Sequence, residues 1–341
     1  MRRIIEAADR LVAARRAVGV ALAFVEDGAV VGEQAVGRAD RDIALTPRHV
    51  FQAASLAKLA TAWLVLGLAE RGRLELDAPL ERYLTRWRLP ASGFDHSGVT
   101  VRRVLSHTAG LSLPDYPGFE PGRKLPALEA SLSGDTNGGG DLRVIEPPGA
   151  RFRYSGGGFA LLQLLVEERS GEPFAARAAG RLFRPLGMTR SSFDPGSPLA
   201  DEAASGHDAR GAALPFYRYD GAAAAGLMAT AGDLARFAAA HMAGPNREPA
   251  GRGIVSPAAI EAMLTPQART ERADGLWPEY GLGAEIERGA NGRTLAGHHG
   301  TNRGWRALLA MDLAARRAVV LLANCDAAGP ALEALLADWR G

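Results

Sequence analysis

Ser55 and Lys58 stand three residues apart at the head of an apolar segment, where FQAASLAK at 51–58 runs directly into LATAWLVLGLA. On an α-helix, positions i and i+3 lie on one face, so the Lys58 amine can reach the Ser55 hydroxyl. A serine hydroxyl becomes a good nucleophile only when a base takes its proton. Burial against the apolar helix would lower the lysine pKa from about 10.4 toward 7, which corresponds to about 4 kcal/mol.

The position of this pair at a helix N-terminus favours the same chemistry, because backbone N–H groups exposed there can hold a developing oxyanion. A simpler interpretation makes Ser55 a helix cap and Lys58 a surface residue of the first turn, since a pattern of four residues occurs by chance in many proteins. Other segments of the chain decide between the two interpretations.

Tyr154 ends a Pro/Gly-rich segment, PPGARFRYSGGG at 147–158, and precedes three glycines and an apolar helix. The glycines leave room for a substrate to approach the backbone. A phenol that points into a cleft can relay a proton between a nucleophile and a leaving group, whereas a phenol on a hydrophobic edge would only cap that edge. The segment therefore adds a candidate acid–base group.

A third segment, LAGHHGTNRGWRALLAMD at 295–312, contains His298 and His299 in a run typical of a strand. Side chains alternate between the two faces of a strand, so we expect these histidines to point in opposite directions and only one of them to serve a cleft. Metal binding by the pair is disfavoured for the same reason. No HExxH or comparable ligand spacing occurs elsewhere in the chain.

Strands are predicted near both ends of the chain. After an N-terminal amphipathic helix, two β-rich runs flank Glu26, Asp27 and Gly28, which is a hairpin signal. A closing helix is predicted at 330–339. Before it, four further strand candidates lie at 280–287, 293–299, 304–312 and 316–324.

Helical periodicity dominates the middle of the chain, from about residue 55 to 264, and is clearest at 102–111, 158–171 and 231–244. Strands at both ends with helices between them indicate one antiparallel sheet built from the two termini and an inserted helical unit. We expect a cleft where the sheet and the helical unit meet.

The three segments together resemble the serine β-lactamase and penicillin-binding-protein superfamily, in its branch with class C β-lactamases, D-alanyl-D-alanine carboxypeptidases and related esterases. The resemblance extends from about Val18 to Asn324 and includes VLSHTAGL at 104–111, PGARFRYS at 148–155 and AGLMATAGDLARF at 225–237. It implies an α/β (α+β) fold of the β-lactamase type.

That fold has an antiparallel sheet from both termini, flanked by helices, with an inserted all-helical subdomain. We expect one such domain over residues 1–341, in which 1–65 and 265–341 form the sheet-containing part and 66–264 form the mostly helical part.

The resemblance also implies roles for single residues. Ser55 matches the acylated nucleophile, and Lys58 matches its partner in proton transfer. Tyr154 matches the tyrosine of the Tyr-x-Asn element, which acts as general base and later activates water. The backbone N–H groups of Ser55 and Thr301 would form the oxyanion hole.

Three positions are expected to contribute to substrate binding, and two of them depart from the family pattern. Gly156 replaces the Asn of Tyr-x-Asn, which removes a hydrogen bond worth about 0.5–1.5 kcal/mol. His298 stands where many members have the lysine of Lys-Thr-Gly, and a largely neutral imidazole is a weaker anchor for a carboxylate. Gly300 matches the glycine of that motif. Both departures favour an ester or an unusual amide over acyl-D-alanine substrates.

Composition limits the other possibilities. The chain has 341 residues, 47% of them hydrophobic and 23% charged, as in an ordinary soluble globular protein. The net charge of +2 comes from 40 basic and 38 acidic residues that are scattered along the chain, so we expect no nucleic-acid partner. Cys325 is the single cysteine, which excludes an internal disulfide and disfavours a cysteine-based metal site.

No uncharged apolar run reaches the roughly 18 residues that a membrane-spanning helix needs, and the N-terminal segment lacks the pattern of a signal peptide. We therefore expect no membrane span and a cytoplasmic location. A periplasmic or secreted location applies if a leader segment precedes the chain as given.

The sequence thus predicts a serine hydrolase that forms an acyl-enzyme with a small-molecule ester, amide or β-lactam and needs no metal or organic cofactor. D-Ala-D-Ala carboxypeptidase, β-lactamase and acyl transferase activities remain alternatives. A catalytically silent ligand-binding relative is a further alternative, although a binding protein has no need for Ser55, Lys58 and Tyr154 together.

Overall fold

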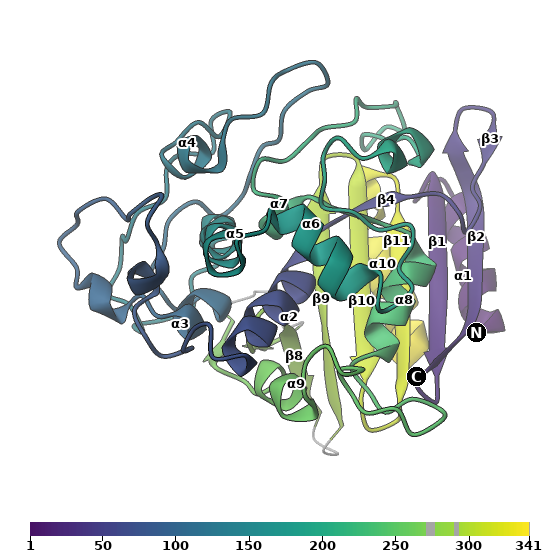
Figure 1. The fold of residues 1–341 in the computed structure, drawn as a ribbon. Coiled ribbons are helices and arrows are strands. Elements are labelled where there is room, and N and C mark those ends of the chain that lie inside the picture. Colours follow the sequence, from purple (N-terminus) through teal and green to yellow (C-terminus); the bar gives the residue numbers. More distant parts are fainter. Residues whose placement is uncertain (271–276, 290–292, 341) are drawn as a thin grey trace.

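The computed structural model describes residues 1–270, 277–289 and 293–340. A nine-stranded antiparallel sheet forms its centre, with the strand order β3-β2-β1-β11-β10-β9-β8-β7-β6 (Figure 1). The two ends of the chain meet in this sheet, because β1 pairs with β11. Its strands are β1 (Gly19–Glu26), β2 (Ala29–Asp40), β3 (Ile43–Ala44), β6 (Ala268–Arg269), β7 (Glu279–Tyr280), β8 (Glu285–Arg288), β9 (Thr294–Asn302), β10 (Trp305–Asp312) and β11 (Arg317–Ala323).

The antiparallel sheet predicted from both ends of the chain is confirmed, and so is the first hairpin. Asp27 and Gly28 have φ angles of 51° and 73°, as the tight turn between two twisted strands requires. One strand prediction is wrong: residues 280–287 form parts of the two strands β7 and β8 instead of one. Gly283, with a φ of +80°, lies in the turn between them.

Helices cover both faces of the sheet (Figure 1). On one face α1 (Arg2–Ala13) packs against α10 (Gly329–Arg340). On the other face α8 (Ala231–Ala239) packs against β1, β2 and β11, and α2 (Ala57–Glu70) and α5 (Gly156–Ser170) pack against each other in the same core. A second sheet has two strands, β4 (Phe51–Ala54) and β5 (Leu227–Ala229). The remaining α-helices of the described residues are α3 (Val101–Leu105), α4 (Leu128–Leu132), α6 (Phe174–Ala178), α7 (Ala222–Ala225) and α9 (Pro257–Met263).

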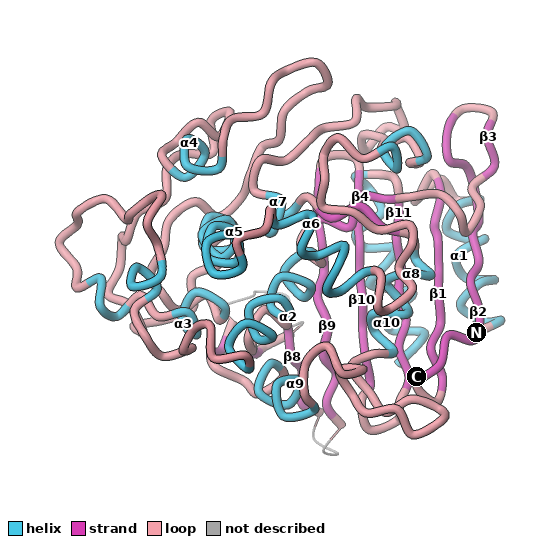
Figure 2. Tube along the Cα trace, in the orientation of Figure 1, coloured by secondary structure: helices cyan, strands magenta, loops and turns pink. Residues whose placement is uncertain are grey.

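The predicted helices are present, but two of them are shorter than expected. The helix predicted at 102–111 ends at Leu105, and the one predicted at 231–244 ends at Ala239. The helix at 158–171 corresponds to α5, and Gly171 closes it in the left-handed conformation typical of a C-terminal cap. Figure 2 shows that most of the chain between α3 and α5 is loop, with α4 within it.

The central strands separate two hydrophobic cores. Along β11, Val319 and Leu321 belong to the core under α1 and α10, whereas Val320 and Leu322 belong to the larger core that includes α2, α5 and α8. Alternate residues of a strand face opposite sides of the sheet. Because a core covers each side, β11 carries apolar residues that are buried on both faces of the sheet.

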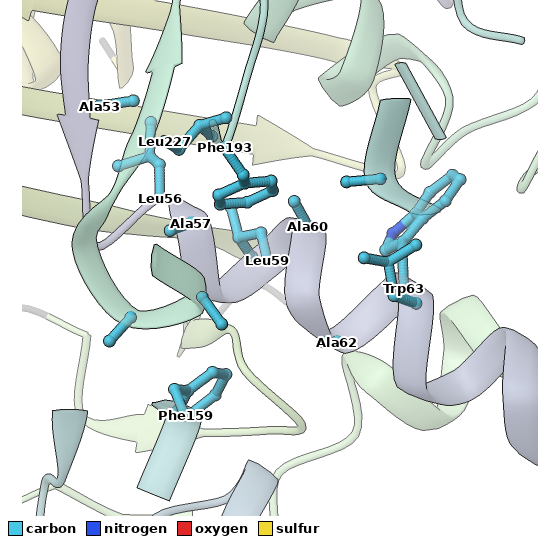
Figure 3. Packing of buried hydrophobic residues seen from close by; sticks show 14 of the residues in the cluster. Ala53, Leu56, Ala57, Leu59, Ala60, Ala62, Trp63, Phe159, Phe193 and Leu227 are labelled. Carbon is cyan, nitrogen blue, oxygen red and sulfur yellow. The ribbon is translucent and has the colours of Figure 1, made fainter. Parts of the chain in front are cut away.

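Helix α2 lies inside the larger core and is apolar on all sides. Its residues from Ala57 to Leu68 are buried, and Figure 3 shows its side chains packed near Phe159 and Phe193. A helix that is hydrophobic all round is stable only in the interior. Its first turn therefore carries Lys58 into the interior. None of the helices in the described residues is long and apolar enough to cross a bilayer.

Candidate active site

A sharp turn between β4 and α2 presents Ser55. Ala54 has a φ of 49°, a left-handed conformation that is uncommon for a residue with a side chain. Strand β4 is held by β5 on one side, and α2 begins directly after the turn. The turn thus fixes the serine between two rigid elements, and its side chain is only partly buried.

The three predicted proton-transfer groups meet at one atom. Lys58 Nζ donates a hydrogen bond of 3.0 Å to Ser55 Oγ, and the Tyr154 hydroxyl donates another of 3.0 Å to the same oxygen. Lys58 Nζ also donates to the carbonyl oxygen of Ala224, at 2.8 Å. Folding therefore brings Tyr154 to Ser55, although the two are 99 positions apart in the chain.

Lys58 is 2% exposed, and burial lowers its pKa to about 7. The negative charges of Asp115 and Glu285 act in the opposite direction, since they favour the protonated amine. The ammonium group also lies 4.9 Å from the ring centre of Tyr154. A large fraction of Lys58 is then neutral near pH 7 and able to accept a proton from the serine.

Tyr154 is positioned by the N-terminus of α5. Ser155 caps this helix, since its Oγ accepts a hydrogen bond of 3.0 Å from the Gly158 amide. The Ser155 amide donates to Nδ1 of His107 at 3.1 Å, and the His107 ring lies 4.3 Å from the Tyr154 ring. Burial lowers the pKa of His107 well below its usual value, so this histidine supports the phenol as a neutral ring.

Gly300 allows β9 to approach the nucleophile closely. A Cβ atom there would lie 2.6 Å from the Ala53 carbonyl oxygen and 3.1 Å from the Ser55 amide nitrogen. The amide of His299 donates toward β8, to Glu285 Oε2 at 3.0 Å, and amides two residues apart on a strand point the same way. The Thr301 amide is thus directed to the same side, and Thr301 lines the cavity next to Ser55.

Gly156 also lines the cavity, and a neighbouring loop occupies the space that a side chain there would need. Its amide donates to the Pro114 carbonyl oxygen at 2.8 Å, and a Cβ atom would lie 2.8 Å from that same oxygen. The loop that approaches Gly156 brings Asp115 and Tyr116 to the cavity wall. Asp115 and Gly156 thus both line this cavity.

His298 is fully buried and is absent from the described residues that line the cavity. Its Nε2 accepts a hydrogen bond of 3.0 Å from the Tyr280 hydroxyl, and burial lowers its pKa to about 4, so the ring is neutral at pH 7. His299 is the histidine that faces the cavity. The structure thus places His298 behind the wall, where its side chain cannot contact a bound substrate directly.

The two histidine rings are closer than strand alternation predicts. Their centres are 5.6 Å apart and their planes differ by 25°, so the expectation that they point away from each other is wrong. Polar contacts explain the difference, because His298 Nδ1 bonds to the His299 carbonyl oxygen and His299 Nδ1 lies 2.6 Å from Glu285 Oε1.

Glu285, His298 and His299 bring one potential metal ligand atom each to within 4.8 Å of one another. Both ring nitrogens of His298 already have hydrogen-bond partners, and Nδ1 of His299 contacts the glutamate.

The cavity has a volume of about 1090 Å³ and extends well beyond Ser55. Polar residues to which the sequence motifs assign no role contribute to its wall. The spacing of His299 and Thr301 along β9 is one available signal, because alternate residues of a strand share a face. Those polar lining residues are Asp115, Asn137, Glu285, His299, Asn302, Arg303, Arg306 and Asp326.

Comparison with known proteins agrees with this arrangement. The family model described as Beta-lactamase matches residues 4–338. The chain belongs to this family. Membership confirms the resemblance inferred from the three sequence segments.

Two curated relatives illustrate the range of the family. Esterase EstB of Burkholderia gladioli is 30% identical over 203 residues, which are 56% of this chain and 50% of that protein. The D-aminopeptidase of Brucella anthropi is 27% identical over 309 residues, 84% of this chain and 52% of that protein. The chain therefore spans about half the length of the curated relatives it matches.

Among solved structures, the octameric penicillin-binding protein homologue from Pyrococcus abyssi matches with a TM-score of 0.82 and 24% identity. The match covers 98% of this chain and 76% of that one. At this identity the comparison concerns the fold alone, and it agrees with the antiparallel sheet flanked by helices.

Proposed function

We propose that the protein is a serine hydrolase that forms an acyl-enzyme on Ser55 with a small-molecule ester or amide. The observation that carries the proposal is the meeting of Lys58 Nζ and the Tyr154 hydroxyl at Ser55 Oγ, each at 3.0 Å, in the wall of a large cavity. A nucleophile in hydrogen-bond reach of two acid–base groups is the usual signature of covalent catalysis.

In acylation, Ser55 Oγ forms a bond to the substrate carbonyl carbon and releases its proton. The neutral fraction of Lys58 can accept it, and a protonated Lys58 can equally stabilise a Tyr154 phenolate that accepts it. The proton then passes to the leaving group as its bond to carbon breaks. The amides of Ser55 and Thr301 hold the carbonyl oxygen as it becomes negative.

The substrate-binding positions favour an ester or an unusual amide. A neutral, buried His298 offers no cation for a substrate carboxylate, and Gly156 offers no side-chain amide. Relatives named as an esterase and a D-aminopeptidase support both bond types. D-Ala-D-Ala carboxypeptidase and β-lactamase activities are tested as alternatives below, since Arg303 and Arg306 in the cavity wall offer cations to a substrate carboxylate.

The test is labelling with a fluorophosphonate, followed by intact-protein and peptide mass spectrometry. We expect one adduct, located on Ser55, in the wild type and none in Ser55→Ala. Ser97→Ala makes the same change on the surface, outside the cavity, and should label like the wild type. An undiminished adduct in Ser55→Ala would rule out the assigned nucleophile.

Parallel assays with a short-chain p-nitrophenyl ester, a D-alanyl peptide and nitrocefin then separate the hydrolase activities. Product analysis with an added alcohol or amine distinguishes an acyl transferase. Saturable ligand binding in calorimetry, without turnover or labelling, would indicate a silent binding protein instead.

A further inference from the structure

The turn between β9 and β10 places an arginine in the cavity wall. Arg303 follows β9 directly and forms this two-residue turn with Gly304, and it lines the same cavity as Ser55. Arg306, also in that wall, pairs with Asp326 at 2.9 Å. By contrast, no carboxylate of the described residues lies within ion-pair distance of Arg303. Its positive charge is therefore available to a bound anion.

Two tyrosines hold Arg303 in place. Its Nη1 donates a hydrogen bond of 2.8 Å to the Tyr217 hydroxyl, and its Cζ lies 4.8 Å from the centre of the same ring. The Tyr217 hydroxyl donates in turn to Glu120 Oε1 at 3.2 Å, and the Arg303 amide donates to the Tyr219 hydroxyl at 3.3 Å. A guanidinium has five N–H donors in a rigid fork, so those that do not serve Tyr217 can bind a carboxylate in two places at once.

The turn itself is fixed at both ends. Asn302 is 4% exposed, and its side-chain amide donates to Gln52 Oε1 at 2.9 Å and to the Ala225 carbonyl oxygen at 3.0 Å. The Gly304 amide donates to Asp326 Oδ1 at 2.8 Å. A cation that is held in place before a ligand arrives loses little freedom on binding it.

The distance to the reacting centre limits which anion fits. Thr301, whose amide is proposed to hold the substrate carbonyl oxygen, is two residues before Arg303, which is at most about 7 Å along the backbone. The carboxylates of Asp115 and Glu285 act on the charge of Lys58, so the reacting end of the cavity carries negative charge of its own. That charge disfavours a carboxylate next to the scissile bond, whereas a carboxylate several bonds away can reach Arg303.

We propose that the substrate carries a carboxylate several bonds from the scissile carbonyl group and that Arg303 binds this carboxylate. The proposal rests on the proposed acyl-enzyme function and names its substrate class, an anionic ester or amide. Arg303 is then a specificity-determining residue, because it binds a part of the substrate that does not react. Binding energy from such a remote group contributes to kcat/KM.

The test compares p-nitrophenyl esters of equal length that differ in the charge at the far end of the acyl chain: the adipate monoester, the hexanoate and the 6-aminohexanoate. A second pair, the butyrate esters of 4-hydroxybenzoate and p-cresol, places the carboxylate in the leaving group. In one of the two sets we expect the wild-type kcat/KM, relative to the rate with hydroxide alone, to be about 10-fold or more higher for the anionic ester than for the neutral one. About 0.5 M salt should weaken this preference, because it screens charges.

Substitutions of Arg303 should change the preference according to charge. Arg303→Gln should lower the ratio of kcat/KM for anionic and neutral esters by about 10-fold, and Arg303→Lys should retain part of it. If the acyl chain reaches Arg303, then Arg303→Glu should favour the 6-aminohexanoate. The matched control is Arg169→Gln, because Arg169 also lies over a tyrosine ring, 5.5 Å from the centre of Tyr83, but outside the cavity. Its ratio should equal that of the wild type.

Two results would overturn the role of Arg303 while leaving Ser55 acylation intact. One is an equal wild-type kcat/KM for anionic and neutral esters in both sets, and the other is a ratio that Arg303→Gln leaves unchanged. A merely structural role for Arg303 would reduce the rates with all esters alike and keep that ratio. Absence of ester cleavage and of any Ser55 adduct in the wild type would instead overturn the proposed function.

Discussion

Lys58 gives the site its acid–base behaviour, and its environment follows from its position on α2. The amine has to remain within 3.0 Å of Ser55 Oγ while its helix is buried on all sides. Burial disfavours the charged form, and the hydrogen bond to the Ala224 carbonyl oxygen gives the amine a polar partner that does not depend on its charge.

This environment predicts the pH dependence of acylation. The pKa of Lys58 is lowered to about 7, so the amine is protonated and cannot act as a base below that pH. We expect kcat/KM for an ester to rise with pH, with a midpoint near 7, and then to level off. Lys58→Arg, which stays protonated, should reduce kcat/KM by about 100-fold or more at every pH. A wild-type profile that is flat from about pH 5.5 to 8.5 would contradict the role of the neutral amine.

At the scale of elements, the site depends on how closely β9 approaches the turn between β4 and α2. Gly300 lies against the Ala53 carbonyl oxygen and the Ser55 amide, which leaves no space for a methyl group. The two amides proposed as the oxyanion hole come from these two elements. Their separation is therefore set by packing between elements and not by either segment alone.

Gly300→Ala should push β9 away from Ser55. We expect the free energy of unfolding to fall by about 1–3 kcal/mol because of the forced contact. We also expect kcat to fall by about 100-fold, as for the loss of one oxyanion donor. The measurements are denaturant titration and ester kinetics. Gly180→Ala serves as the control, since its added methyl group meets no atom within 4 Å; similar kcat losses in both variants would argue against this explanation.

At the scale of the whole molecule, the sheet separates the catalytic face from a second core. Helices α1 and α10 pack on the far face of the sheet. The side chains of Leu332, Leu335 and Leu336, which belong to α10, are buried there. An ion pair between Arg3 and Asp338 joins the two helices at the surface. This core stabilises the sheet without contributing residues to the described wall of the cavity.

Leu335→Ala tests this separation. Leu335 is fully buried, and its truncation should lower the free energy of unfolding by about 2–5 kcal/mol. Well below the melting temperature, kcat and KM should remain within about twofold of the wild type, because independent distant sites rarely couple. A large change in kcat of the folded variant would show that the two cores are coupled through the sheet.

Several features of this protein follow from the sequence alone because they depend on short-range geometry. The spacing of Ser55 and Lys58 places the two side chains one turn apart where α2 begins, with Ser55 in the turn before the helix, and Asp27 with Gly28 makes the hairpin turn. Near-continuous apolar runs identify β10 and β11. The order and residues of the segments around Ser55, Tyr154 and His298 also identify the family, and the family implies the fold.

Only the tertiary structure decides the features that depend on contacts between distant segments. Strand alternation predicts that one of His298 and His299 serves the cleft, and the family resemblance assigns this role to His298, whereas the structure places His299 in the cavity wall beside Glu285 of β8. The sequence predicts a lost hydrogen bond at Gly156, and the tertiary structure adds that the Pro114 carbonyl oxygen lies only 2.8 Å from where a Cβ atom would stand. Local pattern specifies which faces are apolar, but the chemistry of a cavity is set by whichever side chains long-range packing brings together.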